Sequence, residues 1–330
     1  MGVEFRNEGV KSNVLGKPMK EPQDVPFEKE GQYLKSDNRS NISYFLEHNV
    51  LLRRFTLSVG VLANYNSALN EGIHFYPGID ASYRIGDNVR LYGSWNRALR
   101  MPTFTDLYYE GKTNKGNPDL KPEESEAFEV GLKYNTYFLR AHIAGFYRKG
   151  KNMIDWVKEK PEDIWESQNL TKVDNLGFET NLSLLPRELG NERFFIRKIE
   201  LGYAFIHQDK DSEGYISNYA LDYLKHKFTA QLSHSIWKGF SATWYVRWQD
   251  RAGSYTKYEN LKPAYEEPYA PYCLVDMKVN WEYQRLNLYA ELNNLLNSTY
   301  YDLGNIPQPG IWFKAGFRYC LLYTSDAADD

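Results

Sequence analysis

Apolar and polar residues alternate with a period of two along most of this 330-residue chain, and this feature limits the fold more than any other. In segment 240–248 every second residue is apolar, and segments 273–283 and 55–65 repeat the pattern. Successive side chains of a β-strand point to opposite faces of a sheet, so each segment is expected to have one apolar and one polar face. Segments with the helical period are essentially absent. The sequence therefore predicts an all-β fold.

The pattern predicts about fourteen strands, with boundaries good to a few residues. They lie near residues 3–12, 38–50, 52–66, 74–86, 88–98, 124–135, 137–157, 164–185, 197–209, 225–237, 240–251, 272–284, 286–295 and 311–319. After the first strand the links alternate between long and short, and 186–195 is the one longer link on the short side. This alternation indicates an antiparallel up-and-down meander with long loops at one end and tight turns at the other. Outer-membrane β-barrels are built in this way.

The lengths of the strands and the placement of the aromatic residues favour a membrane barrel. At about 3.3 Å per residue and a tilt of about 40°, strands of ten residues or more cross an apolar band about 25 Å tall. Aromatic residues make up 16% of the chain, although its mean hydropathy is −0.63. Many of them, such as Tyr65, Tyr134 and Trp237, lie near strand ends, where membrane barrels carry aromatic girdles. The alternative is a soluble β-sandwich or propeller in which the apolar faces form a common core.

Composition and motifs exclude several other classes of protein. The net charge of −3 argues against a nucleic-acid-binding protein. The two cysteines, Cys273 and Cys320, are too few for a disulfide scaffold or a thiolate metal site. No His-Glu-x-x-His, Gly-x-Ser-x-Gly or Walker motif is present, and the long loops hold no acids at calcium spacing. We therefore expect no catalytic residues, no metal and no cofactor.

Residues 97–131 carry the most specific motif in the chain. Its key positions are Arg97, Arg100, Pro102, Asp106, Leu107, Tyr108, Gly116, Asn117, Pro118, Leu120, Pro122, Glu123, Glu129 and Gly131. The motif resembles the signature of TonB-dependent outer-membrane receptors, in which a strand ends in Arg-x-Pro and Gly-Asn-Pro-x-Leu-x-Pro-Glu leads into the next strand. The resemblance continues through 177–180, 291–297 and the strand that follows Pro309-Gly310. It is closest to the cobalamin-receptor branch.

The prolines of the signature have a direct physical reading. Pro102, Pro118 and Pro122 fix φ and bar the preceding residue from a helix, so the loop is expected to be stiff and extended. Gly116-Asn117 predicts a turn. We expect these positions to fold the loop rather than to contact a ligand.

The resemblance also implies parts that we do not expect within this sequence. Receptors of the family have twenty-two strands and an N-terminal plug domain behind a signal peptide. Here about fourteen strands are predicted, and the first begins at once. We therefore expect residues 1–319 to be the C-terminal portion of a receptor barrel, although a complete fourteen-stranded barrel is the alternative. Residues 320–330 do not resemble the family and are expected to be an artefactual or disordered tail.

The function implied by the resemblance is energy-coupled uptake of a scarce, bulky nutrient across the outer membrane of a Gram-negative bacterium. A cobalamin or a ferric siderophore is the expected ligand, and heme or a glycan is not distinguished from them. The expected partners are outer-membrane lipid and the TonB-ExbB-ExbD motor, which would act through the plug. Alternative functions are a passive porin-like channel and a soluble, aromatic-rich β-module that binds glycans.

Ligand contacts are expected on the long loops, where rigid aromatic rings with polar tips suit a large amphipathic ligand. The candidates are Tyr108, Tyr109, Lys112, Asn114, Trp156, Trp165, Tyr215, Tyr219, Tyr223, Tyr255, Tyr258, Tyr300 and Tyr301. The polar strand faces, with residues such as Arg90, Glu129, Lys278 and Glu291, are expected to line the lumen. Their mixed charge suits a lumen packed against a plug, or a water-filled pore, and disfavours an ion-selective channel.

Overall fold

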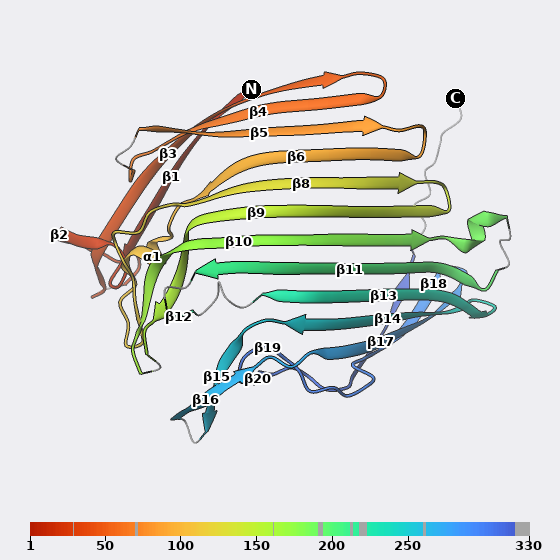
Figure 1. Ribbon diagram of the computed structural model, residues 1–330. Coiled ribbons are helices and arrows are strands. Elements are labelled where there is room, and N and C mark those ends of the chain that lie inside the picture. The colour runs from red at the N-terminus through yellow and green to blue at the C-terminus, as the bar shows by residue number, and fades with distance from the viewer. Residues whose placement is uncertain are drawn as a thin grey trace, which may run out of the picture. The chain divides into compact units, whose positions relative to one another are not determined.

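The computed structural model describes residues 1–28, 30–69, 72–160, 162–190, 194–211, 214–217, 223–259 and 262–320. Each of the fourteen predicted strands is present in it (Figure 1). They are β1 (Gly2–Ser12), β3 (Gln32–Leu51), β4 (Phe55–Asn66), β5 (Ile73–Arg84), β6 (Val89–Arg100), β8 (Glu123–Asn135), β9 (Leu139–Lys158), β10 (Trp165–Leu184), β11 (Ile196–Asp211), β13 (Leu224–Trp237), β14 (Phe240–Arg251), β17 (Tyr272–Tyr283), β18 (Leu286–Asn293) and β21 (Trp312–Tyr319). The period-two pattern was therefore a reliable guide to the long strands.

Short elements that the pattern did not predict occupy the links. They are β2 (Lys17–Asp24), α1 (Phe104–Tyr108), β7 (Asn114–Lys115), η1 (Pro186–Leu189), β12 (Ile216–Ser217), β15 (Ser254–Glu259), β16 (Lys262–Pro268), β19 (Tyr301–Leu303) and β20 (Ile306–Pro307). The prediction that the signature loop is extended throughout was wrong, because α1 lies within it. Pro102 precedes the helix and only bars its own predecessor from helical φ and ψ, so α1 can begin after Thr103.

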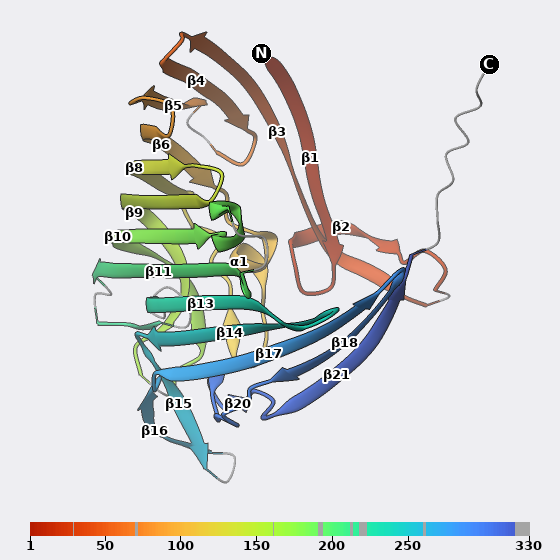
Figure 2. The ribbon, with the colours of Figure 1, turned by 90° about the vertical axis from the view of Figure 1, so that its right-hand side faces the viewer.

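The chain divides into two compact units. The first consists of Met1–Lys133, Ala144–Phe178 and Ile206–Tyr223, and the second of Tyr134–Ile143, Glu179–Phe205 and Leu224–Asp330. In the first unit, β3 pairs antiparallel with β1 and β4, and β5 pairs antiparallel with β4 and β6. Strands β1 and β3 run side by side over eleven residue pairs from Gly2↔Phe45 to Ser12↔Lys35 (Figure 2). Long strands in this unit thus pair with their neighbours in sequence.

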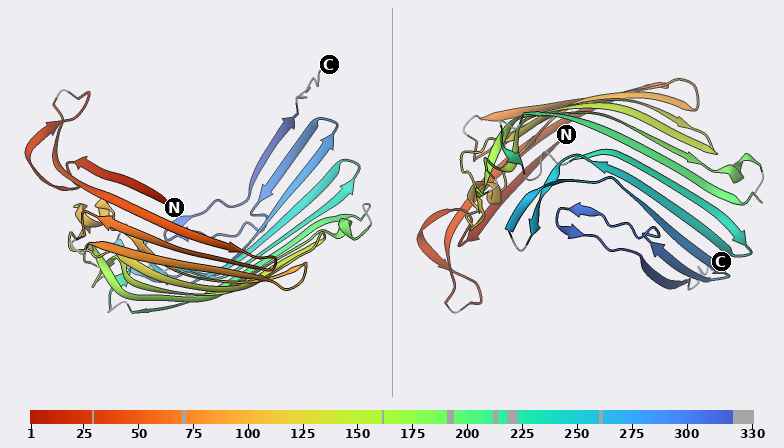
Figure 3. Two further views of the ribbon diagram at one scale, coloured as in Figure 1. Left: turned by 90° about the horizontal axis from the view of Figure 1, so that it is seen from above. Right: turned by 60° about the horizontal axis from the view of Figure 1, so that its bottom comes forward.

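The second unit repeats this arrangement. Successive antiparallel pairs join β11 to β13, β13 to β14, β14 to β17, β17 to β18 and β18 to β21. The blue strands β17, β18 and β21 lie side by side in Figure 3. The tight turn between β13 and β14 requires Gly239, which has φ 73°. A Cβ added at this position would lie 2.5 Å from the carbonyl oxygen of Glu282.

The apolar strand faces are exposed in both units, although a soluble core would bury them. Val130 on β8 is 59% exposed in the first unit, and Phe317 on β21 is 74% exposed in the second. In the first unit, buried side chains gather instead at the loop ends of β9 and β10, where Val157 and Leu170 are nearly inaccessible. The densest packing therefore lies where the long loops fold against the strand ends.

Candidate ligand-binding loops

The signature loop of the first unit is tied to the strand wall by a charge pair whose carboxylate is buried. Nε and Nη2 of Arg100 each donate a hydrogen bond of 2.6 Å to the carboxylate of Glu123, in a bidentate pair. The same carboxylate accepts the backbone N–H of Ile154 at 2.8 Å, so it joins β6, β8 and β9. Glu123 is buried, and these donors compensate for the loss of its water.

Helix α1 begins with a capping box. The hydroxyl of Thr103 accepts the backbone N–H of Asp106 at 3.0 Å, and the Asp106 carboxylate accepts the backbone N–H of Thr103 at 3.0 Å. The nearest guanidinium nitrogen of Arg100 lies 3.9 Å from the Asp106 carboxylate. The signature residues Arg100, Pro102 and Asp106 therefore start and anchor this helix.

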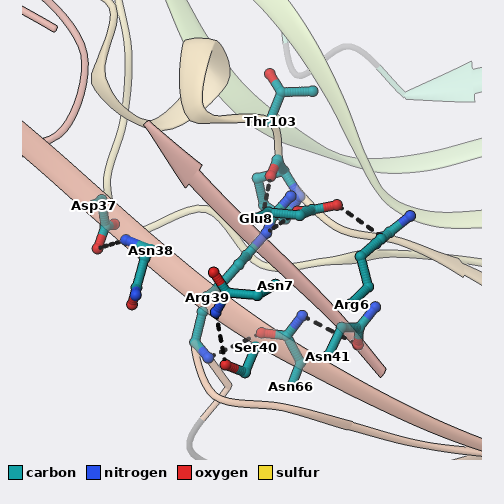
Figure 4. Close-up of polar contacts among 12 residues, drawn as sticks. Arg6, Asn7, Glu8, Asp37, Asn38, Arg39, Ser40, Asn41, Asn66 and Thr103 are labelled. Carbon is teal, nitrogen blue, oxygen red and sulfur yellow. Dashed lines mark hydrogen bonds and ion pairs between the residues drawn. The ribbon is translucent and has the colours of Figure 1, made fainter. Parts of the chain in front are cut away.

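Arg39 on β3 connects the first strands to the same loop. Its guanidinium donates 2.6 Å hydrogen bonds to the Glu8 carboxylate and to the carbonyl oxygen of Pro102, and it stacks 5.0 Å from the ring centre of Phe104. Figure 4 shows Arg39 between Glu8 on β1 and the segment that leads to Thr103. Only 8% of Arg39 is exposed, so this contact is a buried junction of β1, β3 and α1.

Tyr108, which we predicted to contact a ligand, has a partner within the protein. Its hydroxyl donates a 2.6 Å hydrogen bond to the carboxylate of Asp37 on β3. Burial and this carboxylate raise the pKa of Tyr108 well above its ordinary value, so the hydroxyl keeps its proton. Tyr108 therefore adds a second link between α1 and β3.

The second half of the signature turns the chain back to β8. A Cβ on Gly116 would lie 2.8 Å from the backbone of Leu107 and Tyr108, so no larger residue fits there. The backbone N–H of Asn117 donates to the Asp106 carbonyl at 2.9 Å, and its side-chain oxygen accepts the N–H of Asp119 at 2.9 Å. Pro118, Leu120 and Pro122 complete this return, with Leu120 buried.

On β8 the remaining signature residues face Tyr92 of β6. The Tyr92 hydroxyl donates to Glu129 at 2.8 Å, and a Cβ on Gly131 would lie 2.5 Å from the Tyr92 ring. Arg97 lies 3.7 Å from Glu124 and 3.3 Å from Glu126. These positions shape the strand wall through contacts within the protein.

An aromatic and polar group lies beside the signature loop in the first unit. The rings of Tyr109 and Trp156 meet edge to face at 6.4 Å, and the ammonium group of Lys158 lies 4.6 Å from the ring centre of Trp165. A cavity of about 260 Å³ is lined by Val157, Lys158, Glu159, Asp163, Ile164, Glu166, Gln168 and Tyr215. The structure thus gathers Trp165 and Tyr215 near this cavity, beside Asn114, which pairs with Trp165.

A second aromatic group, here called the tyrosine cluster, lies in the loops of the second unit and consists of Tyr255, Tyr269, Tyr272, Tyr300 and Tyr301. Ring centres are 5.1 Å apart for Tyr255 and Tyr269, 5.8 Å for Tyr255 and Tyr301, and 4.7 Å for Tyr272 and Tyr300. The cation of Arg251 lies 4.7 Å from the Tyr269 ring centre, and that of Lys257 lies 5.7 Å from the Tyr301 ring centre. A cavity of about 320 Å³ opens between Leu224, Gln249, Arg251, Tyr272, Tyr301 and Asp302.

The β15–β16 hairpin carries a charged pair beside this cluster. Lys257 donates a 2.9 Å hydrogen bond to Glu267, which also accepts the hydroxyl of Tyr255 at 3.2 Å. The bond from Lys257 lowers the pKa of Glu267, and Glu267 in turn raises the pKa of Lys257. Burial, and then Glu267, raise the pKa of Tyr255.

The other predicted ligand residues are more scattered. Tyr258 is 54% exposed, and Lys112 is exposed on the signature loop. The Tyr223 hydroxyl accepts the backbone N–H of Gln208 at 3.3 Å. Tyr219 lies outside the described residues.

Sequence reasoning missed several members of the second site, namely Gln249, Arg251, Tyr269, Tyr272 and Asp302. Gln249 and Arg251 continue the polar face of β14, and the two tyrosines flank Pro271 at the start of β17. Their sequence positions fit a strand face and a loop end, but only the fold brings them together with Asp302.

Two further structural searches were negative. Within the described residues, no group of three or more His, Cys, Asp or Glu side chains could hold a metal ion. None of the helices there has the length and apolar character needed to cross a membrane.

The chain is similar in sequence to known proteins. Residues 1–295 match the family described as "TonB dependent receptor-like, beta-barrel". Vitamin B12 transporter BtuB of Vibrio vulnificus is 25% identical over 191 residues, which are 53% of this chain and 30% of that protein. Iron-regulated outer membrane virulence protein of Vibrio cholerae is 26% identical over 226 residues, or 60% of this chain and 33% of that protein. The chain spans roughly a third of the length of these curated relatives.

Solved structures resemble the chain over nearly all of its length. A mutant of the ferric enterobactin receptor PfeA from Pseudomonas aeruginosa, in complex with enterobactin, has a TM-score of 0.71 at 18% identity. The match covers 96% of this chain and 51% of that one. The siderophore receptor PirA from Acinetobacter baumannii has a TM-score of 0.68 at 16% identity, with the same two coverages. At these identities the likeness establishes the fold alone.

Proposed function

Because this chain belongs to the TonB-dependent receptor-like β-barrel family, we propose that it is part of a receptor for energy-coupled uptake of a bulky nutrient, either a cobalamin or a ferric siderophore. Its place is the outer membrane of a Gram-negative bacterium. The predicted family and the predicted fold, strands of an antiparallel up-and-down transmembrane barrel, are confirmed. The soluble sandwich and the soluble glycan-binding module are set aside.

The match of residues 1–295 to the family carries this proposal. The relatives suggest the class of ligand, since one is a vitamin B12 transporter and another is the ferrienterobactin receptor of Escherichia coli, 22% identical over 81% of this chain. Each unit has a group of aromatic residues among its own long loops, and each group offers a surface for such a ligand. The candidate residues among them are proposed contacts.

The remaining parts of the proposal concern the whole receptor. Residues 1–319 supply part of the barrel wall and its outer loops. Residues 321–330 of the expected tail lie outside the described residues. A plug domain and the TonB-ExbB-ExbD motor supply the energy coupling, so this segment does not transport by itself. The receptor catalyses no reaction and needs no cofactor.

Growth of a bacterium that lacks its own receptors tests the proposal. The full-length receptor that contains this segment is expressed, and cobalamin or a ferric siderophore is supplied at limiting concentration. Growth is expected on one of the two nutrients and only when TonB is present. Growth without TonB, together with steady conductance of the purified receptor in a lipid bilayer, would identify a passive porin-like channel instead.

A further inference from the structure

Two tight turns of the second unit lie next to each other and carry exposed cations. Lys238 lies in the turn between β13 and β14, and Arg285 lies in the turn between β17 and β18. The turns are joined because the backbone N–H of Glu282 donates to the Gly239 carbonyl at 2.9 Å. Neither the Lys238 ammonium group nor the Arg285 guanidinium has a hydrogen bond or ion pair to any residue that the structure describes. Two unpaired positive charges are therefore held at this end of the second unit.

The neighbouring carboxylate, that of Glu282, faces the other side of the sheet. It lines a polar cavity together with Arg318, and it accepts a hydrogen bond of 3.2 Å from the side-chain nitrogen of Asn287. Trp281 and Tyr283, the residues on either side of Glu282, point to the opposite, apolar face because successive side chains of a strand alternate. The carboxylate therefore belongs to the polar face and leaves the two cations at the turns without a partner.

Aromatic rings cover the apolar face beside the two cations. Phe240 lies opposite Trp281 in the register of β14 and β17, with ring centres 6.0 Å apart, and the rings of Trp281 and Tyr283 stack at 5.9 Å. Trp237 lies opposite Phe240 and is 75% exposed. We call this surface the basic rim, which consists of Trp237, Lys238, Phe240, Trp281, Tyr283 and Arg285. An exposed apolar surface edged by cations is complementary to an amphiphile with apolar chains and an anionic head group.

The position of the basic rim indicates which lipids it meets. The short turns of an outer-membrane barrel face the periplasm, and this chain belongs to a family of such barrels. The basic rim is therefore expected at the periplasmic leaflet, which consists of glycerophospholipids, some of them anionic. Basic residues at the edge of a membrane attract anionic head groups. Tyrosine and tryptophan rings with a polar tip, such as those of Trp237 and Tyr283, are favourable at the same depth.

We propose that the basic rim is a binding site for an anionic glycerophospholipid of the periplasmic leaflet. Lys238 and Arg285 hold its phosphate. Its acyl chains lie along the exposed apolar face, which continues from Tyr283 to Leu288 and Phe317, two residues that are opposite each other in the register of β18 and β21. The site lies at the other end of the strands from the long loops, so it goes beyond the proposed uptake function and takes a different kind of ligand.

The lipid selectivity of the receptor that contains this segment tests the site. The purified receptor in detergent is offered equal amounts of phosphatidylglycerol, which is anionic, and phosphatidylethanolamine, which has no net charge. Native mass spectrometry measures the ratio of the two bound lipids at low occupancy. The wild type is expected to bind phosphatidylglycerol about twentyfold more tightly. Lys238→Gln and Arg285→Gln are each expected to lower this ratio about fivefold, and the double variant should show no preference.

Matched variants separate the site from the net charge of the protein. Arg318→Gln makes the same change at the same end of the strands but on the polar face, and Lys262→Gln removes a lysine charge on the β15–β16 hairpin. Both are expected to leave the lipid ratio unchanged. Arg285→Lys keeps the positive charge and should keep the ratio. Circular dichroism checks that each variant is folded.

Three results would overturn the site. The first is equal binding of the two lipids by the folded wild type. The second is an equal loss of selectivity in Arg318→Gln and Arg285→Gln, which would assign the effect to overall charge. The third is binding of acidic, soluble peptidoglycan fragments that is lost in Lys238→Gln, without any lipid selectivity, which would assign the basic rim to the cell wall. None of these results changes the proposed uptake function, which is judged by TonB-dependent growth.

Discussion

At the scale of single residues, the signature motif works mainly through contacts inside the protein. Arg100 holds Glu123, Asp106 caps α1, and Tyr108 donates to Asp37. Arg39, which is outside the motif, holds the same loop from β3. The most specific residues of the sequence therefore position a loop, and their contacts predict how substitutions will affect it.

Arg39→Met is expected to loosen α1, because Glu8 and the Pro102 carbonyl lose their buried donor. The expected cost is about 1–3 kcal/mol of unfolding free energy. Denaturant unfolding in detergent measures the cost, and hydrogen exchange of residues 102–109 locates it. The control is Arg6→Met, which removes an exposed 2.9 Å pair with the same Glu8 and should cost about 0–1 kcal/mol. Equal costs for the two variants would contradict a buried role for Arg39.

The β15–β16 hairpin is expected to lose order at both extremes of pH. The pKa of Glu267 is lowered from 4.5, so its stabilising effect is complete above that pH and is lost as pH falls through its value in the folded chain. The pKa of Lys257 is raised from 10.5, so its contribution is complete below that pH and is lost as pH rises further. Hydrogen-exchange protection of residues 254–268, corrected for the intrinsic exchange rate, measures the loss of order at low pH and at high pH. Lys257→Met should make this protection depend less on pH. A pH profile of protection identical to that of the wild type would refute the pairing of Lys257 with Glu267.

At the scale of elements, the sequence predicted what depends on local pattern and missed what depends on the fold. All fourteen long strands follow from the period of two, because one face of each is apolar. Helix α1 has too few residues to show a period, and only its Thr103-x-x-Asp106 box marks it. Asp302 joins Tyr272 across thirty positions of sequence. Contacts of this kind arise only when strands and loops are placed in space.

Gly116→Ala tests the turn that returns the signature loop to β8. The new Cβ would meet backbone atoms at 2.8 Å, and backbone cannot move aside as a flexible side chain can. We expect a loss of about 1–3 kcal/mol and faster protease cleavage within residues 109–121. The matched control is Gly9→Ala on β1, whose Cβ would have its nearest neighbours at 3.8 Å. Cleavage of Gly116→Ala at the wild-type rate would show that the turn adapts.

At the scale of the whole molecule, the two faces of each strand meet different surroundings. The apolar face is exposed in both units, and membership of an outer-membrane family makes lipid its neighbour. The polar face holds charge pairs such as Lys278 with Glu291, 2.7 Å apart. The same substitution should therefore have different costs on the two faces.

Val130→Arg places a charge on the lipid-facing side of β8 and is expected to cost about 2–4 kcal/mol if the residue lies near the bilayer midplane. Asn96→Arg, on the polar face of the neighbouring β6, is the control and should be nearly neutral. Both are measured by reversible unfolding from lipid vesicles. A larger loss for Asn96→Arg would reverse the assignment of the two faces.

The pairing of long strands with their sequence neighbours also bears on how fast the chain gains structure. Two residues separate β13 from β14, and another two separate β17 from β18. Closing such short loops costs little entropy, and the cost of longer links, such as 252–271, grows only with the logarithm of their length. Contacts that are local in sequence also favour rapid folding. The sheet can therefore form one hairpin at a time, and each hairpin can form before the rest of the chain has reached the membrane.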